Sequence, residues 1–207
     1  MLNTNDNPFL PPDYEVPKAP GKYLKFRDGT RVKDSVVTRF RILSPTPLMG
    51  NVGWTEIGGK PKPVRKAMSE TWKHGEVKDN KVSHFWLLAV WNYEVGRIQV
   101  LELTQSTIQE PIKEYASDPD YGHPTGFDIV VKQTVKGEKT NYTVTPKPRK
   151  PLDPDIAAAW EELQDRFDLG RMFSGGDPFG DEMPAENGNG SAPADGEAID
   201  PDGDLPF

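Results

Sequence analysis

Aromatic and basic side chains occur close together between residues 39 and 97, and this combination could bind a single strand of nucleic acid. Bases stack on aromatic faces, and each stacked base contributes about 1–3 kcal/mol whatever its identity. Lys and Arg side chains add affinity because they bind phosphates and release counterions. The candidate DNA-binding residues are Arg39, Arg41, Trp54, Lys60, Lys62, Arg65, Lys66, Trp91, Tyr93 and Arg97.

The aromatic candidates differ in how well their positions suit stacking. Trp86 and Trp91 lie in one apolar segment at an odd spacing, so on a strand they face opposite sides and at least one belongs to the core. Tyr93 is next to a turn and is predicted to be exposed. Trp54 lies among basic residues and is the stronger stacking candidate. Trp160 recurs at helical spacing with apolar residues and is predicted to pack.

Motifs for catalysis and for metal binding are missing from the sequence. The three histidines, His74, His84 and His123, are far apart and have no cysteine partner. There is no Walker A sequence and no GxSxG motif. The absence of cysteine also excludes disulfides and thiolate metal sites. We therefore expect a protein without enzymatic activity, cofactor or metal.

Charge divides the chain into a basic body and an acidic tail. Residues 1–150 carry 23 Lys and Arg against 17 Asp and Glu, whereas residues 151–207 carry 2 against 15. This asymmetry is typical of proteins that bind nucleic acid or that are regulated by partners, although a solubilising tail remains an alternative. The acidic segment ends in three residues that include a terminal aromatic, which suits a partner pocket with an apolar base and a basic rim. The candidate partner-binding residues are Asp202, Asp204, Leu205, Pro206 and Phe207.

Alternating apolar residues predict about six strands. Two hairpins are expected. The first lies near the N-terminus and turns at Asp28 and Gly29. The second covers residues 127–146 and turns at residues 136–139. The apolar segment 83–93 is expected to be a buried strand that returns through a turn into residues 98–104. Residues 39–42 predict a half-buried strand with Arg39 and Arg41 facing water or a ligand. Residues 45–82 are expected to form a long functional loop.

The fold class predicted from these elements is mainly β. We expect a small antiparallel oligonucleotide-binding (OB) barrel with one inserted helix, a C-terminal helix and a disordered acidic tail. The C-terminal helix begins at Asp153 and Pro154 and is expected to close at Gly170. The predicted domains are a flexible arm at 1–20, the OB-fold DNA-binding domain at 21–150, a linker and amphipathic helix at 151–173, and the disordered tail with its interaction tip at 174–207.

Two parts of the sequence resemble known families. The segments HFWLLAVWNYEVGRIQVLELTQSTIQ (84–109) and FDIVVKQ…YTVTPKP (127–148) resemble phage-type single-stranded DNA-binding proteins with an OB fold. The ending DGDLPF resembles the acidic, Phe-terminated tip of bacterial single-stranded DNA-binding proteins. The basic segment GKPKPVRK (59–66) matches a loop of the phage family, which implies DNA contact at Lys60, Lys62, Arg65 and Lys66. Some relatives carry a Cys/His zinc site, and this chain lacks those cysteines.

The resemblance implies a protein that coats single-stranded DNA during phage replication, recombination and repair. Its tip would recruit replication and recombination proteins. Self-association of the protein is a further open possibility. No apolar run is long enough to cross a bilayer, so we expect a cytoplasmic protein, in a bacterial host if it is phage-encoded. Three other readings stay open: an RNA-binding barrel module, a protein–protein adaptor and a metal-dependent nuclease.

Overall fold

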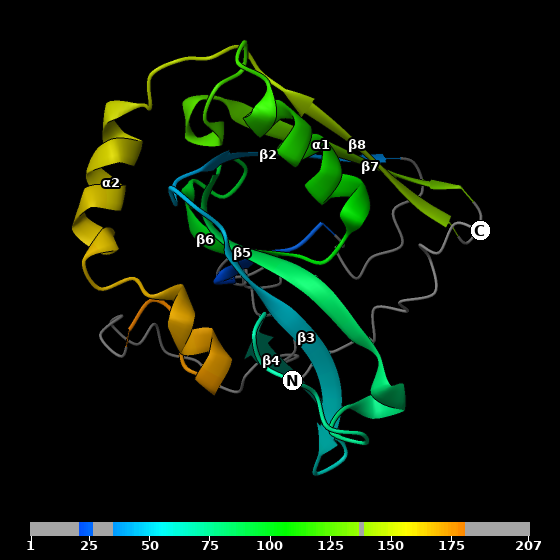
Figure 1. Cartoon of the computed structure of the whole chain (residues 1–207). Helices are drawn as coiled ribbons and strands as arrows, with labels where there is room; N and C mark the ends of the chain where they lie inside the picture. The colour runs from blue at the N-terminus through cyan, green and yellow to red at the C-terminus, as the bar shows by residue number, and fades with distance from the viewer. Residues whose placement is uncertain (1–20, 27–34, 137–138, 181–207) are drawn as a thin grey trace, which may run out of the picture.

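The computed structural model describes residues 21–26, 35–136 and 139–180, and in this part the fold is mainly β (Figure 1). All eight strands belong to one sheet. The strands are β1 (Tyr23–Leu24), β2 (Ser35–Ile42), β3 (Leu48–Ile57), β4 (Lys60–Ala67), β5 (Val82–Asn92), β6 (Arg97–Leu103), β7 (Asp128–Lys136) and β8 (Lys139–Pro146). The helices are α1 (Ser106–Ser117) and α2 (Pro154–Gln164), with 3-10 turns at Lys78–Asn80, Pro124–Gly126 and Leu169–Ser174.

The sheet has the order β1-β6-β5-β2-β7-β8, and the β3–β4 hairpin joins it through β5. The buried strand β5, its return strand β6 and the β7–β8 hairpin confirm the predictions for those segments. The prediction of an all-antiparallel sheet is wrong, because β1 runs parallel to β6 and does not pair with β2. Among the described residues the end strands β1 and β8 do not pair with each other, so the sheet is open.

Residues 45–82 are not the long loop that their composition predicts. Most of this segment forms the β3–β4 hairpin, paired from Gly50 with Ala67 to Ile57 with Lys60. Gly58 and Gly59 make its turn with φ of +62° and +76°, which residues with a side chain rarely adopt. The four residues KPKP obscure the strand in the sequence. A strand tolerates Pro at an edge, and β4 pairs only with β3.

Two cores lie on opposite sides of the curved sheet. The side that we call the inner face packs on α1, through residues such as Phe40, Leu88 and Ile112. The other side, the outer face, packs on α2 and the 169–174 turn, through residues such as Phe85, Leu87 and Met172. Trp86 packs against the inner core and Trp91 against the outer core, which confirms that they face opposite sides.

The segment after β8 folds onto the outer face. Asp153 caps α2 by accepting a hydrogen bond from the Asp155 backbone N–H, as the sequence predicts. Trp160 packs against the outer core, also as predicted. The helix ends at Gln164 and not at Gly170, which lies in the following 3-10 turn. Phe179 is buried as well, so residues 174–180 belong to the folded part and not to the tail.

Several predictions fall on residues outside those described. They are the arm at 1–20, the turn at Asp28 and Gly29, and the partner-binding tip with Asp202, Asp204, Leu205, Pro206 and Phe207. Within the described ranges, neither helix is long and apolar enough to cross a membrane.

Candidate nucleic-acid interface

The β3–β4 hairpin carries candidate residues on both of its faces. Residues directly opposite each other in an antiparallel pair share a face, and β3 pairs Trp54 with Pro63 and Ile57 with Lys60. Trp54 lies on the outer face, where 41% of its surface is exposed. Lys60 and Lys62 lie on the inner face, and both are exposed. Figure 1 shows the hairpin extending away from α1 and α2. The hairpin therefore presents one aromatic ring and two cations to solvent.

Arg65 and Lys66 belong to the same strand but are held by carboxylates. The Arg65 guanidinium lies 2.6 Å from Glu102 Oε2, and its side chain is largely buried. Lys66 Nζ lies 2.6 Å from Glu76 Oε1, and it also sits 4.8 Å from the centre of the Trp72 ring. A phosphate would have to displace these carboxylates. The structure therefore separates the four basic residues of 59–66 into two exposed cations and two paired ones.

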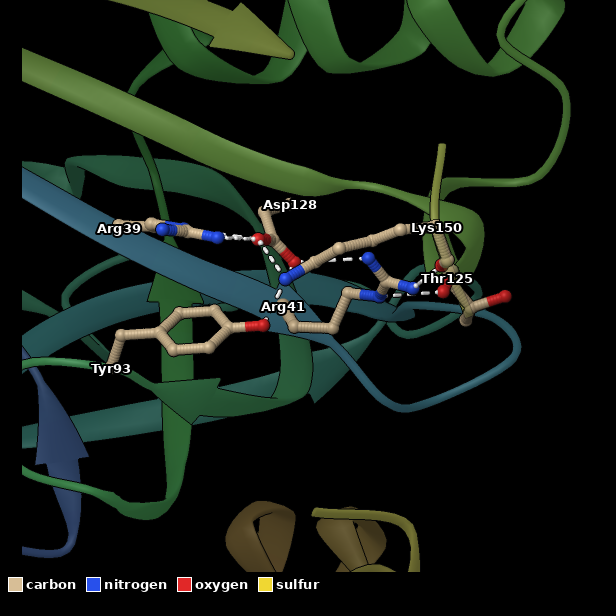
Figure 2. A network of polar contacts seen from close by, with 6 residues as sticks. All are labelled: Arg39, Arg41, Tyr93, Thr125, Asp128 and Lys150. Carbon is tan, nitrogen blue, oxygen red and sulfur yellow. Dashed lines mark hydrogen bonds and ion pairs between the residues drawn. The ribbon is translucent and has the colours of Figure 1, made fainter. Parts of the chain in front are cut away.

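A second group of polar residues surrounds the Asp128 carboxylate at the start of β7 (Figure 2). Arg39 and Arg41 reach it from β2, which lies beside β7 and pairs Arg41 with Asp128. Arg41 Nη1 donates to Oδ1 at 2.9 Å, and Tyr93 Oη donates to the same oxygen at 2.9 Å. Arg39 Nε donates to Oδ2 at 3.0 Å, and Lys150 Nζ lies 3.4 Å from that oxygen. Three cations therefore share one fully buried carboxylate.

The protonation state of Asp128 follows from these partners. Burial alone would raise the pKa of its carboxyl group, because a low dielectric disfavours the charged form. Hydrogen bonds from Arg39 and Tyr93 and the charges of Arg39 and Lys150 outweigh burial, so the pKa lies below its ordinary value of 3.8. Asp128 is consequently ionised at neutral pH. The excess of cations leaves the cluster positively charged.

Arg41 is not on a water-facing surface, contrary to the prediction for this strand. Its side chain is only 1% exposed. Besides Asp128, it donates to the Thr125 carbonyl at 2.8 Å and to the Lys150 carbonyl at 2.6 Å. The sequence alternation places it on the same face as Arg39, but segments 125 and 150 cover it. Arg41 therefore connects β2 to two distant segments and does not reach a ligand along the open sheet.

Arg39 and Tyr93 form the solvent-facing side of the cluster. The Arg39 side chain is about two-fifths exposed, and its guanidinium carbon lies 4.5 Å from the centre of the Tyr93 ring. Lys150 Nζ lies 5.6 Å from the same centre. Both contacts are cation–π interactions, which hold the cations in place. Tyr93 is half-buried instead of exposed as predicted, and its ring contacts two cations.

The Tyr93 hydroxyl is expected to titrate at an unusually high pH. Burial and the hydrogen bond to Asp128 raise the pKa of Tyr93 to about 12, from an ordinary 10.0. Because the folded state favours the protonated phenol, its contribution to stability is complete below pH 10 and is lost as the pH rises to 12. The pKa values of Tyr23 and Tyr115 are also raised by burial, so ultraviolet absorbance should show several tyrosines titrating late. Tyr93→Phe should remove a step near pH 12. A Tyr93→Phe difference spectrum centred near pH 10 would contradict the hydrogen bond.

The remaining candidates lie apart from both groups. Trp91 is partly buried against the outer core. Arg97 pairs with Asn92, and Asn92 pairs with Phe40 of β2. Paired residues share a face, and Phe40 belongs to the inner core, so Arg97 lies on the inner face. Arg39 lies on the outer face. Figure 1 places the β3–β4 hairpin and the β7–β8 hairpin at separate ends of the sheet. The structure thus brings Arg39, Arg41 and Tyr93 together and leaves the hairpin residues as a distinct group.

Sequence reasoning missed the residues that organise the cluster. The sequence pattern predicts a strand around Asp128 and gives neither Asp128 nor Lys150 a role in a site. An acidic residue at the start of an otherwise apolar strand is the one signal that could have found Asp128, because buried carboxylates require cationic partners. Within the described ranges, no three His, Asp or Glu side chains gather as a metal site would require.

In comparisons with known proteins, no protein-family model, no curated protein and no solved structure matches this chain. What the fold and the site define is a mainly β protein with an open mixed sheet and basic groups on two exposed regions.

Proposed function

We propose that this protein binds single-stranded DNA without sequence preference and has no catalytic role. The β3–β4 hairpin is the observation that carries the proposal. It offers an exposed indole on one face and two exposed lysines on the other, and neither lysine forms an ion pair with a described residue. Aromatic faces for stacking and cations for phosphates are what non-specific single-strand binding requires.

The architecture supports the same proposal. Strands β2, β5, β6, β7 and β8 share the inner core with α1, and an open sheet of this kind is compatible with the partly open barrel that we propose by analogy with OB folds. The outer face of β2, β7 and β8 is accessible, since Val37, Arg39, Thr143 and Thr145 are exposed there. In this proposal the single-stranded DNA contacts the β3–β4 hairpin and the outer face of β2, β7 and β8. The acidic tip recruits replication and recombination proteins.

The test of the proposed function is a titration with a dT oligomer, followed by tryptophan fluorescence at several salt concentrations. We expect strong quenching that weakens as salt increases, because stacking and phosphate contacts occur together. A duplex of equal length should bind more weakly. Equal or tighter binding to the duplex would overturn the proposal. A matched RNA oligomer that binds more tightly than the DNA would reassign the protein to RNA.

Two neighbouring basic residues on β4 should differ in their effect on DNA binding. Lys62→Ala should weaken binding and reduce the salt-dependence slope by about 0.7, the value for one lost phosphate contact to a single strand. Arg65→Ala should leave the slope unchanged, because Arg65 is already paired with Glu102. The slope of log affinity against log salt concentration is measured for a dT oligomer between about 50 and 200 mM salt, where phosphate contacts make affinity strongly dependent on salt. Equal slopes for wild type and Lys62→Ala would remove the hairpin from the interface.

Removal of the acidic tail should tighten DNA binding at low salt. Residues 181–207 carry eight acidic residues and no basic one, so they repel DNA and can compete with it for the cations. The deletion begins after residue 180 because Phe179 is packed in the outer core. Affinity for dT is compared for the full chain and the truncated chain at low and at high salt. An unchanged affinity at low salt would show that the tail does not compete with DNA.

A further inference from the structure

A pocket of about 380 Å³ opens beside the Asp128 cluster, at the foot of β2 and β7. It is lined by Arg41, by residues 125–126 and by residues 149–152. Its polar walls come from Arg149 and Lys150, and its apolar wall comes from Pro151 and Leu152. None of the lining residues is acidic. The nearest carboxylate described above, that of Asp128, has both oxygens engaged by the cluster.

Buried contacts hold the walls of this pocket in position. Arg41 donates to the Thr125 and Lys150 carbonyls, so one buried side chain ties the two walls together. The Lys150 backbone N–H also donates to the Gly126 carbonyl at 3.2 Å. A site whose cations are already ordered loses less entropy when it binds an anion.

Arg149 packs closely on two glycines at the rim of the pocket. A methyl group at Gly122 would stand 2.6 Å from Arg149 Nη1, and one at Gly126 would stand 3.2 Å from Arg149 Nε. An alanine at Gly122 would push the guanidinium away, and the φ of +64° there also favours glycine. An alanine at Gly126 would shift the guanidinium by a few tenths of an ångström. The two glycines therefore allow the guanidinium to lie close to the backbone beside the pocket.

We propose that this pocket binds one phosphodiester group of the single strand, held by Arg149, while the positively charged Asp128 cluster lies beside it. This inference rests on the proposed function and adds a second contact region, distinct from the β3–β4 hairpin. The Arg149 guanidinium matches the charge of a phosphodiester and can donate to two of its oxygens at once. The ammonium of Lys150, which lies 3.4 Å from Asp128 Oδ2, adds to the positive charge nearby. The apolar wall of Pro151 and Leu152 suits the adjoining deoxyribose. Arg39 lies on the same cluster and would continue the path of the backbone across the outer face.

The experiment compares the salt dependence of dT binding for four proteins. These are the wild type, Arg149→Ala, Lys62→Ala as the hairpin variant, and Lys113→Ala as a control at an exposed position on α1, which packs on the inner face. Arg149→Ala should reduce the slope by about 0.7. A fourfold increase in salt would then weaken wild-type binding about 2.6-fold more than it weakens binding by the variant. Lys113→Ala should keep the wild-type slope.

A second variant keeps every charge and moves only the guanidinium. Gly126→Val, whose side chain is larger than the methyl group that already approaches Arg149 Nε to 3.2 Å, should displace the guanidinium and weaken dT binding. The thermal midpoint of each variant is measured to confirm folding. Chemical shifts of the Arg149 Nε–H group, followed on addition of dT or of inorganic phosphate, distinguish a strand contact from a general anion site. A shift with phosphate but not with dT would overturn the proposal.

The outcomes separate this inference from the proposed function. If Lys62→Ala lowers the slope and Arg149→Ala does not, the pocket is not part of the interface and the proposed function stands. If the wild type does not bind dT, both are overturned. If both variants lower the slope, the strand contacts the hairpin and the pocket.

Discussion

Asp128→Asn is expected to lower the free energy of unfolding by about 3–5 kcal/mol, the usual cost of removing one partner from a buried ion pair. The substitution leaves Arg41 buried with its charge uncompensated. It also replaces an oxygen that accepts hydrogen bonds with an amide nitrogen that cannot. Urea denaturation at neutral pH measures the loss. Asp120→Asn, at an exposed position, is the matched control and should change the free energy by less than about 0.5 kcal/mol.

The cost of Asp128→Asn should depend on pH. The folded-state pKa of Asp128 is below its ordinary value, so the carboxylate contributes stability above about pH 4 and loses that contribution as the pH falls through the folded pKa. The difference between wild type and variant should therefore shrink in acid and stay constant between pH 5 and 8, roughly the range in which no perturbed carboxyl titrates. A difference of less than about 1 kcal/mol at neutral pH would show that Arg41 finds another partner.

Trp54→Ala is expected to weaken dT binding by about 1–3 kcal/mol, or roughly 5- to 150-fold, if one base stacks on the exposed indole. The stability of the fold should change little, because Trp54 lies near the end of the hairpin and is outside both cores. Fluorescence anisotropy of a labelled dT oligomer measures the affinity.

Two further variants make the Trp54 result specific. Trp54→Phe retains an aromatic face and should recover most of the affinity. Ile57→Ala removes an exposed apolar side chain from the opposite face of the same strand and should bind as the wild type does. An unchanged affinity for Trp54→Ala would mean that no base stacks on the hairpin.

Local sequence patterns correctly predicted the elements that depend only on residues close together in the chain. The apolar run of β5, the β7–β8 hairpin and the cap of α2 at Asp153 are where the sequence places them, and the turn between β5 and β6 lies at residues 93–96. Each depends on near neighbours in the chain. The β3–β4 hairpin was missed because its glycines and prolines are typical of loops, and only its position at the sheet edge makes them compatible with a strand.

In the candidate site, local patterns also predicted some features, and others depended on the tertiary structure. Alternation correctly separated Arg39 and Arg41 from Phe40 and Ile42, but it could not tell the two arginines apart. Arg41 is buried because segments 125 and 150 meet over it, and Arg39 remains accessible because nothing described covers its end of β2 so closely. Pairing with Glu102 and Glu76 likewise distinguishes Arg65 and Lys66 from Lys60 and Lys62.

Strand patterns and charge are local properties of the chain, and they were enough to predict a mainly β protein with a basic, aromatic-rich body. Which cations face solvent depends instead on contacts between distant segments. The reason is physical: a cation is neutralised by whichever carboxylate or carbonyl the fold places within a few ångströms, and the carboxylate partners of Lys66 and Arg65 and the partners of Arg41 come from 10 to 109 residues away. The 109-residue separation between Arg41 and Lys150 is an example that no local pattern encodes.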